Sequence, residues 1–112
     1  MATKAKVKPP TVTEKDFTAA VRDLAKLFGW RWYHPFLSKW SEKGYPDVTL
    51  VRERIIFAEL KTDTGKLTPS QEEWLAALKD ASAETYVWRP RNFDAIVETL
   101  RNTHPQEKEA SE

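Results

Sequence analysis

Two acidic residues and a lysine stand in the middle of this 112-residue chain, at Asp47, Glu59 and Lys61. Carboxylates are ligands that hard divalent cations prefer, and a bound cation lowers the pKa of water and neutralises charge that grows on a phosphate. An ammonium beside that cation can hold a phosphate oxygen or orient the attacking water. Reactions on a sugar or a peptide need fewer of these parts, so the three residue types favour phosphodiester cleavage.

The segment 54–61 is rich in branched and aromatic residues and is expected to form a strand. Because side chains alternate between the faces of a strand, one face carries Ile55, Phe57, Glu59 and Lys61. We expect the two charged residues to extend a buried apolar row, which a purely structural strand would continue with apolar residues. The alternative is a surface ion pair on an edge strand, which contributes little stability.

The preceding strand is expected over 46–51. The link between the two strands decides whether the two acids meet. The link is too short for a crossover, so the strands should pair antiparallel. If the loop is the three residues 52–54, Asp47 lies directly opposite Glu59, with Cβ atoms roughly 4.5–5.5 Å apart. Carboxylates that close repel each other unless a cation lies between them. A two-residue loop would shift the register by one and offset the pair.

Three helices are predicted from capping signals and apolar periodicity. Thr11 and Glu14 match a capping box, so the first helix should begin just after Thr11. Thr68 and Gln71 match a second box, with a proline at the first helical position. A third helix is expected over 93–100, where apolar residues recur at helical spacing.

Two further strands are expected over 30–36 and 84–88. The element order is then α-β-β-β-α-β-α, which predicts an α/β domain with a central mixed β-sheet of about four strands flanked by helices. The tryptophans of these elements should lie in the core or a dimer interface: Trp30, Trp32, Trp74 and Trp88.

Composition limits the remaining possibilities. The chain is 40% hydrophobic and long enough for one core. It has no cysteine, which excludes disulfides and thiolate metal ligands and fits a reducing cytoplasm. Its apolar stretches are too short to span a bilayer, so no membrane partner is expected. A net charge of +1 does not indicate a nucleic-acid partner, which local basic patches would have to hold.

Charge and proline placement divide the chain into three regions. Residues 1–10 are expected to be a flexible basic arm, 11–102 the folded domain, and 103–112 a disordered acidic tail. The arm carries three lysines, for which solubility is the simpler interpretation.

Several motifs occur in a familiar order. The segment Gly44-Tyr45-Pro46-Asp47, then Glu59-Leu60-Lys61 with its glutamate twelve residues after Asp47, then Gln71 at a helix start, resembles the PD-(D/E)xK nuclease superfamily. Within that superfamily, the pattern G-x-P-D, E-x-K, a short polar loop and a Q-x-x-W-L helix is similar to the VRR-NUC family. The resemblance runs from about residue 14 to residue 100.

The resemblance implies a restriction-endonuclease-like fold that depends on Mg²⁺ or Mn²⁺. It implies that Asp47 and Glu59 are metal ligands, together with the backbone carbonyl of Leu60. Lys61 would be the catalytic lysine, Gln71 an accessory polar residue, and Glu14 an additional acidic residue. Leu60 replaces the valine of many members, which is a conservative change.

Stand-alone members of the family in phages and bacteria are homodimers that cut branched DNA such as four-way junctions, as Holliday junction resolvases do. This chain shows no further targeting domain and resembles that kind, so we expect it in the cytoplasm of a bacterium or a phage-infected host. A general or restriction-type nuclease of ordinary duplex DNA stays open. So does a non-catalytic DNA-binding module of the same fold, although a decayed site usually loses one of the three charged residues.

Other residues are candidate DNA contacts or have simpler explanations. Gln71 and Glu14 both occupy capping-box positions, and capping can coexist with a role in the site. Trp40 is a candidate for stacking on a base, against a simple packing role. His34 is expected to be a half-buried strand residue rather than a base. Backbone phosphates could be contacted by Tyr45, Arg52, Arg54 and Lys66. No motif reads base sequence, so we expect recognition of DNA shape.

Overall fold

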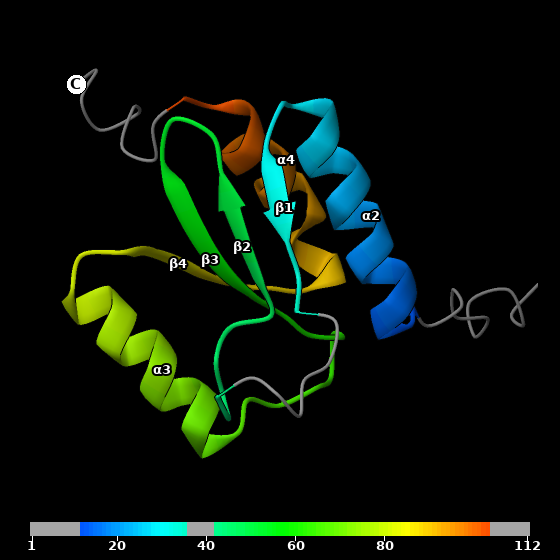
Figure 1. Ribbon diagram of the computed structural model, residues 1–112. Coiled ribbons are helices and arrows are strands. Elements are labelled where there is room, and N and C mark those ends of the chain that lie inside the picture. Colours follow the sequence, from blue (N-terminus) through cyan, green and yellow to red (C-terminus); the bar gives the residue numbers. More distant parts are fainter. Residues whose placement is uncertain (1–11, 36–41, 104–112) are drawn as a thin grey trace, which may run out of the picture.

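The computed structural model describes residues 12–35 and 42–103 and confirms the predicted order of helices and strands (Figure 1). The predicted arm 1–10, Thr11, Trp40 and nearly all of the predicted tail lie outside these residues. In chain order the elements are α2 (Glu14–Leu27), β1 (Arg31–Tyr33), β2 (Val48–Val51), β3 (Ile55–Leu60), α3 (Pro69–Asp80), β4 (Glu84–Trp88), the 3₁₀ helix η2 (Pro90–Asn92) and α4 (Phe93–Arg101).

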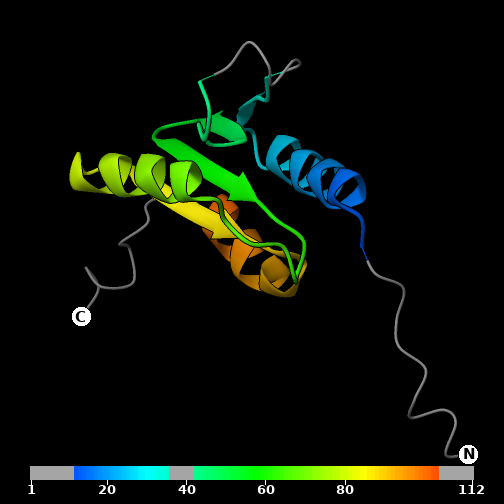
Figure 2. The same cartoon turned by 90° about the horizontal axis from the view of Figure 1, so that it is seen from below.

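The four strands form one mixed sheet in the order β1-β2-β3-β4. The first three strands pair antiparallel, and β4 pairs parallel to β3 after the crossover through α3. Helices α2 and α4 cover one face of the sheet, and α3 lies against the other (Figures 1 and 2). Among the described residues, no helix has the length and apolar character needed to cross a membrane. The α/β class predicted from the sequence is confirmed.

The main core lies between the sheet and the helix pair α2 and α4. Its strand residues are Val48, Leu50, Ile56, Ala58 and Leu60, and its helix residues include Phe17, Val21, Ala25, Ile96 and Leu100. Trp30 and Trp88 are buried there too, whereas Trp32 and Trp74 are partly buried.

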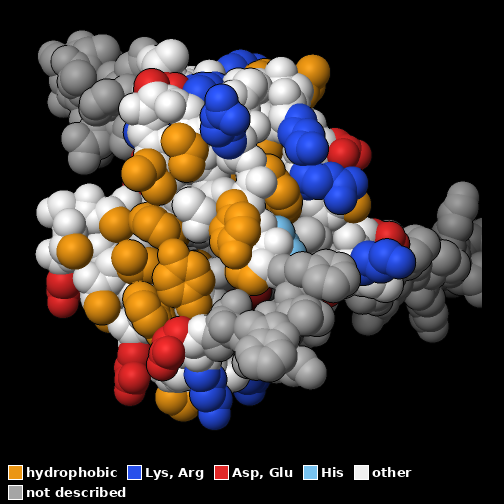
Figure 3. All heavy atoms as spheres, viewed as in Figure 1, with side chains coloured by type: hydrophobic (Ala, Val, Ile, Leu, Met, Phe, Trp, Pro, Cys, Tyr) orange, Lys and Arg blue, Asp and Glu red, His pale blue; other side chains and the backbone are white. Residues whose placement is uncertain are grey.

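The face of β3 that carries Glu59 is less buried than the sequence led us to expect. Ile55 on this face is 51% exposed, and Phe57 is only partly buried. The expectation was wrong because alternation separates two faces without saying which of them two helices will cover. Figure 3 shows hydrophobic side chains gathered on the side of the molecule to which α3 belongs. Glu59 is therefore buried at the end of a partly open row.

Helix α2 begins two residues later than predicted. Its N-cap is Thr13, whose hydroxyl accepts a hydrogen bond from the backbone N–H of Asp16 at 3.0 Å. Thr11 is therefore not the cap, and Glu14 is the first helical residue rather than the reciprocal partner of a capping box. The sequence offers two threonines with an acid three residues later, and the pattern alone does not choose between them.

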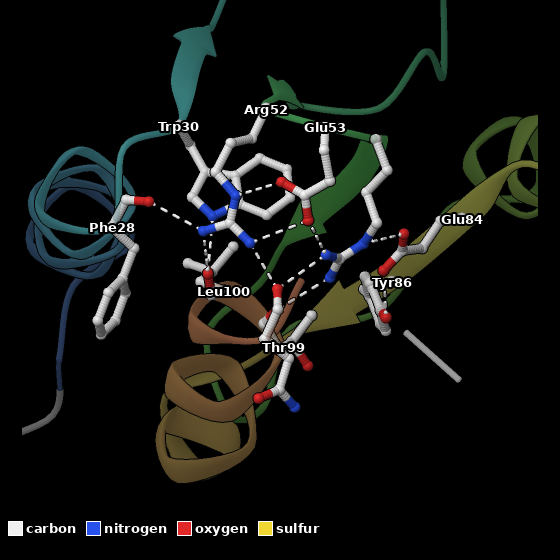
Figure 4. Close-up of polar contacts among 10 residues, drawn as sticks. Phe28, Trp30, Arg52, Glu53, Glu84, Tyr86, Thr99 and Leu100 are labelled. Atoms are coloured by element: carbon white, nitrogen blue, oxygen red, sulfur yellow. Dashed lines mark hydrogen bonds and ion pairs between the residues drawn. The ribbon is translucent and has the colours of Figure 1, made fainter. Parts of the chain in front are cut away.

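The hairpin loop between β2 and β3 holds the C-terminal end of α4 (Figure 4). The guanidinium groups of Arg52 and Arg54 stack on Trp30, with their central carbons 4.4 and 5.1 Å from the ring centroid. Glu53 bridges the two arginines. Both arginines donate to backbone carbonyls, and three of the four acceptor residues lie at the C-terminal end of α4, where cations are favourable. These acceptors are the carbonyls of Phe28, Thr99, Leu100 and Asn102.

Replacing Arg54 with methionine should lower the free energy of unfolding by about 3 kcal/mol, because Arg54 forms an ion pair that is largely shielded from water. Its Nε donates to Glu84 at 2.7 Å, and the two side chains are only 12% and 13% exposed. Urea denaturation measures the change. The matched control is Arg22→Met, since Arg22 pairs with Asp23 at the surface. A loss no larger than that of the control would show that the network does not stabilise α4.

Candidate active site

The hairpin register brings the two predicted acids together. Val48 pairs with Ala58 and Val51 with Ile55, which leaves the three-residue loop 52–54 and confirms the register on which the sequence argument depended. Continued by one position, this register sets Asp47 opposite Glu59. Asp47 immediately precedes β2, and its Oδ2 accepts a hydrogen bond from the backbone N–H of Leu60 at 2.9 Å. The Asp47 carboxylate is thus fixed against β3 beside Glu59.

The loop before Asp47 is pressed against the first turn of α3. Gly44 has φ +86°, and a Cβ added there would lie 2.6 Å from the backbone carbon and oxygen of Ser70. A side chain at this position would therefore be both strained and in collision with backbone. Pro46 is fully buried. The glycine and proline of the G-x-P-D motif thus have packing roles.

Glu59 is the only buried charged residue in the described part of the chain, at 1% exposure. Its Oε2 accepts a hydrogen bond from Nε2 of Gln71 at 2.8 Å, whereas its Oε1 is buried without a hydrogen-bond partner in the described structure. Burial, followed by the negative charge of Asp47, raises the pKa of Glu59 from its ordinary 4.5 to about 8. The hairpin register and the hydrogen bond from Leu60 to Asp47 place the two carboxyl groups beside each other.

Gln71 combines the two roles that its position in the sequence predicted as compatible. The side-chain Oε1 of Gln71 accepts a hydrogen bond from the backbone N–H of Thr68 at 2.9 Å. The backbone N–H of Gln71 donates to the Thr68 hydroxyl at 3.2 Å, which completes the capping box. Its amide nitrogen is the group that holds Glu59. The cap of α3 therefore orients a carboxylate of the candidate site.

Lys61 follows the last residue of β3 and is partly buried. Its backbone N–H donates to the carbonyl of Trp88 at 3.0 Å, so the pairing with β4 continues to this residue. Alternation then puts Lys61 on the face that carries Glu59. Its positive charge lowers the pKa of Glu59, against the larger effects of burial and of Asp47. An acidic pair and an ammonium thus gather at one end of the β2–β3 hairpin.

The oxygen atoms of this site fit a hard divalent cation. The described residues contain no group of three or more His, Cys, Asp and Glu side chains that would hold a metal without help from the backbone or solvent. Two carboxylates are nevertheless enough for an ion such as Mg²⁺, which keeps several water ligands. The unpartnered Oε1 of Glu59 supports this fit, because a buried oxygen with no donor is costly unless a cation or donor completes it.

Four other residues considered from the sequence lie in different surroundings: Glu14, Tyr45, Lys66 and His34. Glu14 is exposed at the start of α2, which lies towards the same end of the molecule as the end of β3 (Figures 1 and 2). Tyr45 packs edge-on against Trp74, with centroids 5.0 Å apart. Lys66 is exposed in the connection between β3 and α3. His34 is exposed rather than half-buried, and its ring stacks with Trp32.

Arg52 and Arg54 lie at the opposite end of the hairpin from the acids, roughly 16 Å along β3 at 3.3 Å per residue. All five N–H groups of Arg52 have acceptors, either backbone carbonyls or Glu53. The predicted contacts of Arg52 and Arg54 with DNA stay untested, and in the structure both guanidinium groups bind backbone carbonyls.

Among solved structures, the chain is similar to one described as a VRR_NUC domain protein. The TM-score is 0.66 at 20% sequence identity, over 82% of this chain and 88% of that chain. The predicted resemblance is thereby confirmed at the level of the fold. No protein-family model matches the sequence, and no curated protein matches it.

The raised pKa of Glu59 predicts how stability depends on pH in metal-free buffer. The folded chain keeps the Glu59 proton up to about pH 8, whereas the unfolded chain releases it near pH 4.5. Over this window the folded state binds more protons, so the free energy of unfolding should fall as the pH rises. Glu59→Gln has no such proton to lose and should give a flatter profile.

Urea denaturation with EDTA at several pH values measures both profiles. Glu73→Gln is the matched control, since Glu73 is an exposed acid on α3. The control should keep the slope of the parent chain. Equal slopes for the parent and Glu59→Gln would contradict the assigned pKa.

Proposed function

We propose that this protein is a metal-dependent nuclease that hydrolyses phosphodiester bonds in DNA. The observation that carries the proposal is the buried Glu59 carboxylate, which faces Asp47 and has one oxygen without a partner in the described structure. An acidic pair of which one member is buried does not help the chain to fold. The fold shared with a VRR_NUC domain protein supports the same conclusion.

The residues of the site would divide the chemistry between them. Asp47 and Glu59, with the backbone carbonyl of Leu60, would hold Mg²⁺ or Mn²⁺. When bound, the ion supplies Lewis-acid stabilisation of the charge that grows on the phosphate. Gln71 keeps the Glu59 carboxylate in one orientation. The Lys61 ammonium binds a phosphate oxygen or orients the attacking water, and Glu14 is the additional acidic residue.

We further propose that the substrate is branched DNA, such as a four-way junction, and that a homodimer cuts it. The motif pattern resembles stand-alone nucleases that act in this way, and no described element has the form of a base-reading motif. Phosphate contacts would come from Lys66 and Tyr45, which lie on segments adjoining the site, and stacking from Trp40. We also propose that residues 11–102 form the nuclease domain and that residues 1–10 are a flexible basic arm.

The site predicts distinct effects on ion binding and on cleavage. Asp47→Asn and Glu59→Gln should lose the heat of Mn²⁺ binding in calorimetry, because each removes a charged ligand. Lys61→Met should keep that heat and yet cut DNA at least about 100-fold more slowly, since it removes a charge from the reacting phosphate. EDTA should abolish cleavage by the parent chain.

Lys79→Met is the matched control for charge, because Lys79 is exposed near the far end of α3. It should cut as the parent does. Full activity of Asp47→Asn or Lys61→Met would show that the proposed site is wrong.

The substrate and the assembly are tested with four DNA forms and by sedimentation. Four-way junctions and flaps should be cut in preference to linear duplex and single strands, and the chain should sediment as a dimer at micromolar concentration. Equal cutting of linear duplex would instead identify a general or restriction-type nuclease. DNA binding with no cutting would identify a non-catalytic module, and a strict monomer would contradict the dimer.

A further inference from the structure

A second cationic residue, Arg89, lies beside Lys61 and belongs to none of the sequence motifs. Glu59 pairs with Val87 and Leu60 with Trp88 in the parallel register. Arg89 has extended backbone angles, with φ −130° and ψ 157°, so the strand geometry continues through this residue. Alternation therefore places Arg89 next to Lys61, on the face of the sheet that carries Glu59.

The guanidinium of Arg89 is bonded to the turn that follows Lys61. Its Nη1 donates to the carbonyl of Thr62 at 2.6 Å and to the carbonyl of Gly65 at 2.7 Å. The turn is closed by Gly65, whose N–H donates to the Thr62 hydroxyl at 3.0 Å. A single nitrogen of the Arg89 side chain thus binds the first and the last residue of the Thr62–Gly65 turn.

This turn lies against the side chain of Lys61. A Cβ added to Gly65 would lie 3.6 Å from Cδ of Lys61 and 3.1 Å from the Thr62 hydroxyl. The backbone of Gly65 therefore limits the positions open to the stem of the lysine. Arg89 is itself held, because its backbone N–H donates to Asn92 at 2.9 Å.

We propose that Arg89 is a positioning residue for Lys61: by holding the Thr62–Gly65 turn, it determines where the Lys61 ammonium lies relative to the acidic pair. The inference rests on the proposed nuclease function and assigns to it a residue outside the motifs. A group that fixes a reacting side chain affects the rate strongly, since a displacement of about 1 Å can cost on the order of 100-fold.

Amide hydrogen exchange tests the contact without reference to activity. Arg89→Met should increase the exchange rate of the Gly65 amide, because the turn loses its external donor. The matched control is Arg91→Met, since Arg91 binds Asp63 of the same turn but is exposed. The control removes the same charge from the same region, and it should change exchange at Gly65 much less. Unchanged exchange at Gly65 in Arg89→Met would overturn the inference.

Cleavage kinetics then test the link to Lys61. Arg89→Met should lower kcat roughly 10- to 100-fold with little change in KM or in Mn²⁺ binding. In a chain that already carries Lys61→Met, the same change should cost almost nothing, because Arg89 acts through the lysine. Arg89→Lys, whose ammonium can donate to both carbonyls, should restore part of kcat.

The outcomes separate this inference from the proposed function. An equal fall in kcat with and without Lys61 would overturn the positioning role, and so would a parental kcat in Arg89→Met. If Arg89→Met fails to fold, the comparison of Arg89→Lys in the two backgrounds applies the same criterion. A parent chain that cuts no DNA would overturn the proposed function, whereas the exchange experiment would still decide whether Arg89 holds the turn.

Discussion

The buried carboxylate of Glu59 is the constraint that the surrounding structure has to satisfy. A carboxyl group shielded from water needs partners, and one of its oxygens has Gln71 while the other has none in the described structure. The neighbouring charge of Asp47 makes the arrangement less favourable still. A sheet that served stability alone would place an apolar side chain at this position. The fold therefore carries a local cost that a bound cation would remove.

Contacts that stabilise the fold and contacts that orient the site are largely the same contacts. Gln71 caps α3 and holds Glu59, and Asp47 bonds to the backbone of β3. Gly44 allows the loop before Asp47 to approach α3. The residues that stabilise the fold around the acidic pair therefore also fix the positions of its two carboxyl groups.

The sequence predicted those parts of the structure that depend on local patterns. The capping box at Thr68 is such a pattern, and it is present. The sequence left the hairpin loop open between two and three residues, and the structure has three. The cap of α2 was misplaced because two threonines fit one pattern, and Thr13 forms the cap. The packing of Arg52 against α4 and the neighbourhood of Arg89 depend on how distant segments meet. No spacing within the chain encodes those contacts.

The length of the hairpin loop is constrained by the register that it sets between β2 and β3. Its three residues set the offset between β2 and β3, and the arginines within it are tied to the last helix. Exchanging one side chain in the loop leaves that offset intact. Gaining or losing one residue would turn Asp47 towards the face covered by α2 and α4 and separate the acids. Substitutions in this loop can therefore weaken the packing of α4 without moving the acids apart, whereas a change in loop length would separate them.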